Sequence, residues 1–240
     1  MPSEAPQENE TIYPETEFQE NPKPKRFKDW FLDMYYQTTP LFNVNVVWFL
    51  LSLPVVTILP SMGGLYYAVL NYQKTKNANW PIFWEGVKKH WLSSLKWGII
   101  VLIGDLLLAL NIWFSLNIDE VWSIYTLTIG VLVAIIWFAI NQFSFPLLLL
   151  QDEKKILLAI RNAYVIVFRR PLDTLKVMAL NIVITAVSIF IPPLWMFITM
   201  ALIVNIQTRT TLQAVEKIRA QDADRDAAEA HRKGEDIKED

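Results

Sequence analysis

The sequence contains no cysteine and only two histidines, His90 and His231, among its 240 residues. The absence of cysteine excludes a disulfide framework, a thiolate nucleophile and a metal site with cysteine ligands. Two histidines are too few for a histidine-rich metal site. We therefore expect neither a metal ion nor another cofactor.

Motifs of soluble enzymes are missing as well. The sequence has no Walker loop, no dinucleotide fingerprint, and neither HExxH nor GxSxG. Glu85 and His90 come nearest to an acid–base pair, but five residues apart they do not share a helix face well. We therefore expect no catalytic residues and no enzymatic activity. The basic stretch 154–171 favours contact with anionic lipid over nucleic acid.

Charged residues make up only 19% of the chain, hydrophobic residues make up 53%, and the charges are concentrated at the ends. Residues 1–40 hold eight acidic and four basic side chains, and residues 216–240 hold nine acidic and six basic ones. The apolar centre, 41–215, is mildly basic, with twelve basic and seven acidic residues. Such segregation is typical of a membrane domain between two polar tails.

This pattern predicts three regions. Residues 1–22 are polar and proline-rich, and we expect a disordered acidic tail because they cannot bury enough apolar surface. They also lack the basic start and apolar core of a secretory signal peptide. Residues 23–210 are expected to form a helical membrane domain. Residues 211–240 are expected to form a charged cytoplasmic tail, disordered apart from a helical start.

Two apolar segments fit single membrane passes. A spanning helix needs about 20 mostly apolar residues. Leu95–Ile118 has this length, and Val121–Leu150 carries no charge over a somewhat longer stretch. Only Asp119 and Glu120 separate them, so we expect an antiparallel helical hairpin.

Two further apolar segments, Leu41–Tyr72 and Leu172–Ile206, are too long for one straight pass and short for two. Each contains helix-breaking residues near its middle. Proline lacks the amide N–H and clashes with the preceding helical turn, and paired glycines permit a reversal. We expect the first bend at Pro60–Gly64 and the second at Pro192–Pro193.

The positions of lysine and arginine predict the topology, because these residues concentrate in cytoplasmic loops. The loop 73–96 and the loop 151–176 are both rich in lysine or arginine, and basic residues also precede Leu41 and follow Ile206. All four regions lie on the cytoplasmic side only if each broken segment crosses twice. This gives six short passes with both tails in the cytoplasm. The alternative is a single kinked pass for the first segment, which gives five passes.

Three segments in or before the loops have amphipathic helical patterns: residues 26–36, 78–97 and 154–168. In 78–97, Asn79 followed by Pro81 favours a helix start. In 154–168, we expect one face formed by Ile156, Ile160, Tyr164 and Val167. We expect these helices to lie in the headgroup region, as anchors or as docking surfaces.

A spaced set of proline, glycine and aromatic residues begins in the first broken segment. It consists of Asn45-x-x-Trp48, Leu53-Pro54-x-x-Thr57-x-x-Pro60 and Gly63-Gly64-Leu65-Tyr66-Tyr67, followed by Phe83 to Lys89, Phe145-Pro146-Leu147-Leu148, Ala163 and Arg170-Pro171-Leu172. Over about residues 27–210 this set resembles the YesL-like family, a group of uncharacterised bacterial integral membrane proteins. Members of that family are often encoded beside sugar transport systems. The resemblance therefore implies an accessory protein of carbohydrate uptake, with a sugar transporter permease as partner.

Asp105 lies near the middle of the first predicted pass, where a charge costs about 2.5–3.5 kcal/mol. Intramembrane acids usually face the interior of a helix bundle. We expect Asp105 either to be protonated or to form hydrogen bonds with polar groups of other helices, for which the candidates are Asn141, Gln142, Asn181 and Thr185. Asn111 and Asn205 are expected to hold helices together. Thr57 is expected to bond a carbonyl freed by Pro54.

Two functions follow from these features. The first is an integral membrane protein of the plasma membrane that serves as an accessory or interaction partner of a transport system. The alternative is a small transporter or channel whose site lies at the broken helices near Asp105. In that case Asp105, Asn141, Gln142 and Asn181 are the candidate binding residues.

Overall fold

A computed structural model describes residues 27–118 and 120–239, with side chains for 38–118 and 120–228. The predicted disordered tail, 1–22, lies outside the described residues. The chain divides into two units, Met1–Tyr36 and Gln37–Asp240, and every helix after the first belongs to the second unit. Within the described residues all regular elements are helices, as the sequence predicts.

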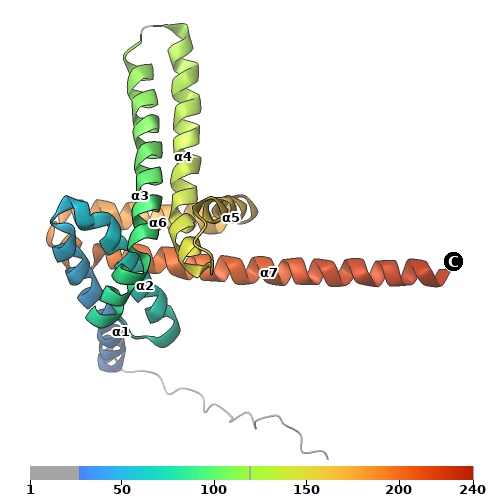
Figure 1. Ribbon diagram of the computed structural model, residues 1–240, viewed down its shortest axis with the longest axis horizontal. Helices are drawn as coiled ribbons and strands as arrows, with labels where there is room; N and C mark the ends of the chain where they lie inside the picture. The colour runs from blue at the N-terminus through green and yellow to red at the C-terminus, as the bar shows by residue number, and fades with distance from the viewer. Residues whose placement is uncertain (1–26, 119, 240) are drawn as a thin grey trace, which may run out of the picture. The chain divides into compact units, whose positions relative to one another are not determined.

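The two helices beside Asp119–Glu120 are α3 (Trp80–Leu116) and α4 (Val121–Leu150), and they pack along each other as a hairpin (Figure 1). Near the turn, the hydroxyls of Ser115 and Thr126 lie 2.9 Å apart, within hydrogen-bond distance. At 1.5 Å per residue, α3 is about 55 Å long, which exceeds a hydrocarbon core of about 30 Å.

The length of α3 corrects one prediction. The amphipathic segment 78–97 is not a separate helix lying in the headgroup region, because from Trp80 onward it forms the first half of α3. The predicted start is right: the Asn79 side chain accepts a hydrogen bond from the Ile82 N–H at 3.1 Å, and Pro81 lies in the first turn. No proline separates this half from the apolar half, and the helix continues through Gly98.

The first broken segment bends earlier than predicted. Helix α1 (Phe27–Ser52) is followed by a short 3₁₀ turn, η1 (Val55–Thr57), and by α2 (Ile58–Thr75). The bend therefore lies at Leu53–Thr57, and the expectation of a bend at Pro60–Gly64 is wrong. Pro60 is the third residue of α2, where the N–H that proline lacks would have no helical partner anyway.

Thr57 has the contacts expected of a threonine three residues after Pro54. Its hydroxyl donates to the carbonyl of Pro54 at 2.6 Å and also contacts the carbonyl of Leu51. The hydroxyl thus contacts the Leu51 carbonyl, at the end of α1, and adds a second bond to the Pro54 carbonyl, which also accepts the Thr57 N–H at 2.9 Å. Thr57 stabilises the bend and does not need a ligand to explain its position.

The glycine pair serves close packing of helices instead of a turn. A Cβ atom at Gly64 would lie 2.5 Å from Val87 Cγ2 and 2.8 Å from the Phe83 carbonyl oxygen, both on α3. A Cβ at Gly63 would meet the Ser94 hydroxyl. From the other side, a Cβ at Gly86 would lie 2.5 Å from Tyr67 Cβ. Small residues let helices approach closely, and these three glycines allow close contact between α2 and α3.

The C-terminal half contains α5 (Ile156–Arg169), α6 (Pro171–Phe190), a π-helix, η2 (Trp195–Thr199), and α7 (Met200–Glu239). Pro192 and Pro193 lie in the short link between α6 and η2. Helix α7 continues through most of the predicted tail, where disorder beyond a helical start was expected. This sequence is rich in alanine, glutamate, lysine and arginine, all of which favour helix.

Helix α5 packs on α4 with a face that differs slightly from the predicted one. Its buried residues are Ala159, Ala163 and Ile166, whereas Tyr164, which was predicted to share one face with Ile156, Ile160 and Val167, is 49% exposed. The small alanines, not the larger side chains, therefore form the centre of the contact.

Asn45 joins α1 to the start of α7. Its amide nitrogen donates to the carbonyls of Trp195 and Met196, both at 2.9 Å, and its amide oxygen accepts from the Ala201 N–H at 2.7 Å. Asn45 therefore makes three hydrogen bonds with the backbone of the π-helix and of the start of α7. This gives a structural reason for an asparagine at the first position of the family-like motif.

Helix α7 contacts α2, α4 and α6 and runs across the α3–α4 hairpin instead of along it (Figure 1). The prediction of six passes requires α7 to begin as a pass beside the hairpin. Its direction in the structure gives that prediction no support. Among the described residues, three helices are long and apolar enough to cross a membrane: Trp80–Leu116, Val121–Leu150 and Pro171–Phe190.

Candidate functional site

A chain of buried polar side chains lies where α2, α4, α6 and α7 meet. The amide oxygen of Gln142 accepts hydrogen bonds from Asn181 Nδ2 and Gln207 Nε2, both at 2.6 Å. The Tyr66 hydroxyl donates to the amide oxygen of Gln207. Each of these four residues is buried. The chain therefore links four helices through side-chain hydrogen bonds, which suits a role in holding the bundle together.

The structure brings together only two of the four predicted binding residues. Gln142 and Asn181 bond directly, as described above. Asn141 lies one residue away, and its amide oxygen is 3.5 Å from the Ser144 hydroxyl. That hydroxyl accepts from the indole N–H of Trp97 at 2.9 Å. None of the hydrogen bonds among the described residues joins Asp105 to this chain.

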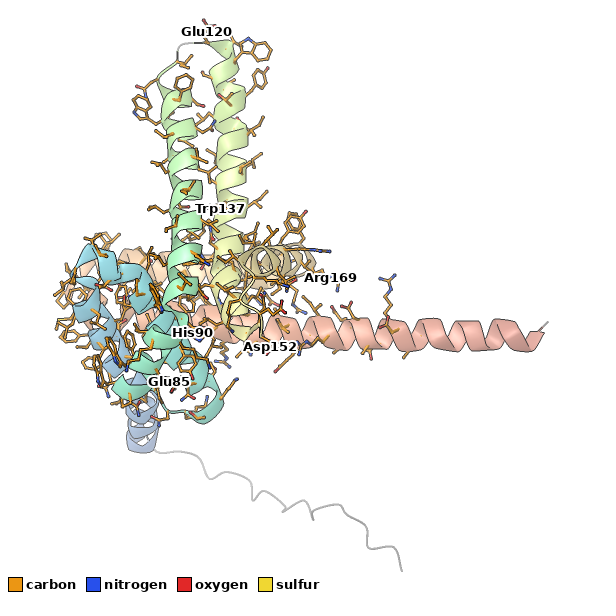
Figure 2. The ribbon with its side chains drawn as sticks, viewed as in Figure 1. Glu85, His90, Glu120, Trp137, Asp152 and Arg169 are labelled. Atoms are coloured by element: carbon orange, nitrogen blue, oxygen red, sulfur yellow. The ribbon has the colours of Figure 1, made fainter. Side chains whose placement is uncertain are left out.

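Asp105 lies instead on the hairpin, with Trp137 as its hydrogen-bond partner among the described residues. The Trp137 indole N–H donates to Asp105 Oδ1 at 2.9 Å. Gly104 makes this possible, because a Cβ there would lie 2.5 Å from Trp137 Cζ2. Figure 2 shows Trp137 between α3 and α4. The predicted partners Asn141, Gln142, Asn181 and Thr185 are therefore wrong for Asp105.

The surroundings of Asp105 are apolar and open. Asp105 itself is exposed, and it lies within a helix whose outward side chains are large and hydrophobic. These include Leu102, Ile103, Leu106, Leu107, Leu110 and Trp113. The expectation that the carboxylate faces the bundle interior is therefore wrong: in this chain it faces outward from the hairpin.

Asn111 and Asn205 make the kind of contact that was predicted for them. The Asn111 side chain lies against Gly130 of α4, where a Cβ would meet its amide oxygen. Asn205 accepts a hydrogen bond from Gln73 Nε2, which links α7 to α2. Both residues contribute to contacts between helices.

Sequence reasoning missed Tyr66, Trp137 and Gln207. Gln207 directly follows the last apolar segment, and nothing in the sequence indicates that it is buried in the bundle. Tyr66 and Trp137 are aromatic residues in apolar stretches, and no sequence pattern distinguishes an aromatic residue that forms a hydrogen bond from one that only packs. For Trp137, the adjacent pair Gly104–Asp105 on the facing helix is a signal that could have indicated an inserted indole ring.

These features define the class of protein. The described residues form an all-helical structure with three helices suited to a bilayer, polar contacts inside the bundle and apolar side chains outside. The chain is thus a helical membrane protein of unknown activity, in contact with lipid.

A family described as "Protein of unknown function, DUF624" matches residues 41–112. This range covers the later part of α1, the bend, α2 and most of α3, including Asn45, Thr57 and the glycine pair. No curated protein and no solved structure matches the chain. The match supports placing this segment in a family whose function is unknown.

Proposed function

We propose that this protein is a non-catalytic component of the cell membrane that docks on a membrane partner through the α3–α4 hairpin. The observation that carries the proposal is the outward position of Asp105. A carboxylate in the middle of an apolar hairpin costs about 2.5–3.5 kcal/mol when lipid surrounds it. A partner helix that supplies hydrogen-bond donors removes much of that cost.

One indole N–H satisfies only part of the hydrogen-bonding capacity of the Asp105 carboxylate. An ionised carboxylate has two oxygens and about four acceptor positions, and Trp137 occupies one. Hydrogen bonds to charged groups contribute about 1.5–3 kcal/mol each, so a second donor has a large effect at this site. The partner is therefore expected to be a transmembrane helix with a lysine, arginine or amide side chain at the level of Asp105.

The lysine-rich segments support an orientation for the hairpin. Lys74 and Lys89 precede the apolar half of α3, Lys154 follows α4, and all three line one cavity. The two loops predicted to be cytoplasmic therefore lie on the same side of the hairpin, as the positive-inside rule requires. We place the Asp119–Glu120 turn on the outer face of the membrane.

The partner that fits best is the permease of a carbohydrate transport system. This rests on the resemblance to the YesL-like family and on the absence of enzyme motifs from the sequence. The docking surface itself requires only a membrane helix of complementary chemistry. An accessory role of this kind needs no catalytic residue and no cofactor.

Site-specific photocrosslinking tests the proposal. A photoreactive residue at Leu102, which is 64% exposed near Asp105, is expected to crosslink to a transporter permease in cells. The same residue at Phe190, exposed on α6, serves as the control position. Asp105→Asn is expected to lower recovery of the permease on the order of tenfold, since it removes a charged hydrogen-bond acceptor. Glu120→Gln removes an acidic group from the hairpin turn and is expected to leave recovery unchanged.

Each other outcome has a definite meaning. Crosslinks only to a second copy of the chain would replace the permease by a homo-oligomer. Crosslinks only to lipid, or equal recovery from Asp105→Asn and wild type, would contradict docking through Asp105.

The alternative function, a small transporter or channel, has less support. Its predicted site at the broken helices near Asp105 is not assembled, because Asp105 bonds Trp137 and Gln142 bonds Asn181 and Gln207. Solute uptake into proteoliposomes distinguishes a transporter from a non-transporting accessory protein. Solute flux through wild type that Asp105→Asn abolishes would favour the transporter.

A further inference from the structure

A cavity of about 300 Å³ lies beside the base of the hairpin, apart from Asp105 and from the buried polar chain. It is lined by residues of α2, α3, the end of α4 and the segment that follows α4. The lining residues that carry polar groups are Tyr67, Asn71, Lys74, Lys89, His90 and Lys154. Figure 2 labels His90 and Asp152 close to this region.

Three lysines line the cavity, Lys74, Lys89 and Lys154. Among the described residues, no carboxylate lies within 4 Å of the ammonium groups of Lys74, Lys89 or Lys154. The acid Glu85 lies beside the cavity and accepts a hydrogen bond from the hydroxyl of Tyr67, a lining residue, at 2.8 Å. Three like charges around one small space repel each other, and an anion in that space would relieve the repulsion.

Lys154 is held in place by the backbone. Its Nζ donates to the Leu149 carbonyl at 2.7 Å and also contacts the Gln151 carbonyl, at the C-terminal end of α4. An ammonium group has three donors, so one remains for a ligand. Burial lowers the pKa of Lys154, and repulsion from Lys89 lowers it further, while Asp152 acts in the opposite direction.

Lys89 and His90 place a further charge and a buried polar atom beside the cavity. The Lys89 ammonium lies 5.5 Å from the centre of the Tyr67 ring, so the aromatic face holds it near the cavity. His90 is 3% exposed, and its Nδ1 atom is buried without a hydrogen-bond partner among the described residues. A buried polar atom of this kind is costly unless something satisfies it.

We propose that this cavity binds a phosphate monoester. A phosphate group is compact, carries up to two charges and has several acceptor oxygens, which suit a cavity lined by three lysines better than a single carboxylate does. The position next to the cytoplasmic end of the hairpin allows two sources of the same chemistry. The group is either the head of an anionic lipid such as phosphatidic acid or a soluble phosphate such as a sugar phosphate.

Titration calorimetry on the full chain in a neutral detergent tests this proposal. The probes are dioctanoyl phosphatidic acid, glucose 6-phosphate and inorganic phosphate, with dioctanoyl phosphatidylcholine as the zwitterionic control. Binding is expected for at least one phosphate monoester and not for phosphatidylcholine. Rising salt is expected to weaken it, because the contacts are charged.

Lys89→Gln is the informative variant, since Lys89 is exposed and its loss is not expected to disturb the fold. It is expected to weaken binding on the order of tenfold. Lys88→Gln is the matched control: the same charge is removed one residue away, from a side chain that lies 5.8 Å from the Trp84 ring and does not line the cavity. Lys74→Gln is expected to act in the same direction as Lys89→Gln.

The outcomes distinguish a lipid headgroup from a soluble phosphate. Binding of phosphatidic acid alone identifies a lipid site, and binding of glucose 6-phosphate or inorganic phosphate identifies a soluble ligand. No binding of any phosphate, equal binding of phosphatidylcholine, or equal losses in Lys89→Gln and Lys88→Gln would overturn the proposal. The site does not depend on Asp105, so Asp105→Asn is expected to leave phosphate binding unchanged.

Discussion

Replacing Asn45 by alanine is expected to destabilise the protein more than any exposed substitution in α1. The change removes three hydrogen bonds, to the carbonyls of Trp195 and Met196 and from the Ala201 N–H. Asn45 is fully buried, at 0% exposure, so no water replaces the lost partners. The three backbone groups then lose their contact with the asparagine side chain.

The magnitude follows from two reference values. Side-chain hydrogen bonds inside membrane proteins average about 0.6 kcal/mol, which gives roughly 2 kcal/mol for three. Leaving a buried polar group unsatisfied costs about 1–3 kcal/mol each in other settings. We therefore expect Asn45→Ala to lower the free energy of unfolding by about 2–4 kcal/mol.

The assay is reversible unfolding in mixed micelles, followed by circular dichroism. Asn43→Ala is the matched control, because Asn43 is exposed on the same helix, and a change within about 0.5 kcal/mol is expected there. Asn45→Asp keeps the volume but replaces the donor amide group with oxygen, so it separates hydrogen bonding from packing. Equal stability of Asn45→Ala and Asn43→Ala would refute the role assigned to Asn45.

Two further pairs of variants test contacts of α2 by the same unfolding measurement. Gly64→Ala places a Cβ 2.8 Å from the Phe83 backbone oxygen and is expected to lower the free energy of unfolding by about 1–3 kcal/mol. Gly63→Ala is expected to lower it less, because its Cβ clashes with the Ser94 hydroxyl, which can rotate; a larger loss for Gly63→Ala would contradict this account. Tyr66→Phe removes the hydrogen bond to Gln207 and is expected to cost about 1 kcal/mol, against no measurable change for the exposed Tyr125→Phe. Equal effects of the two tyrosine variants would remove Tyr66 from the buried chain.

The hairpin was predictable because its signals are local. Two apolar stretches with only Asp119–Glu120 between them leave little choice but an antiparallel pair. The same is true of the helix start at Asn79, where an N-cap residue and a proline specify one arrangement. The all-helical membrane class was predictable from the long apolar segments and from the concentration of charge at the two ends.

The bend and the site depended on contacts between distant residues. Gly63 and Gly64 permit both a turn and a close helix contact, and only the presence of Ser94 and Phe83 across from them decides between the two. Likewise, Asp105 was assigned amide partners by depth along the helix. Its rotational position, which places it beside Trp137 on the outer side, depends on how α3 packs against α4.

The predicted topology rested on lysine placement, and the structure adds a spatial link. Lys74 and Lys89 come from one predicted cytoplasmic loop region and Lys154 from the other, yet they line the same cavity. Residues on opposite faces of a bilayer cannot do this, so the two regions lie on one face if the hairpin crosses.

Cysteine accessibility mapping of the hairpin tests the central claim most directly, because the natural chain contains no cysteine. Single cysteines replace Lys88, Glu120 and Lys155, and a membrane-impermeant thiol reagent is applied to intact cells and to inverted vesicles. Labelling of position 120 only from outside, and of positions 88 and 155 only from the cytoplasmic side, is the result expected. Labelling of all three positions from the same face would show that α3 and α4 do not cross the membrane, and docking through Asp105 would then have no basis.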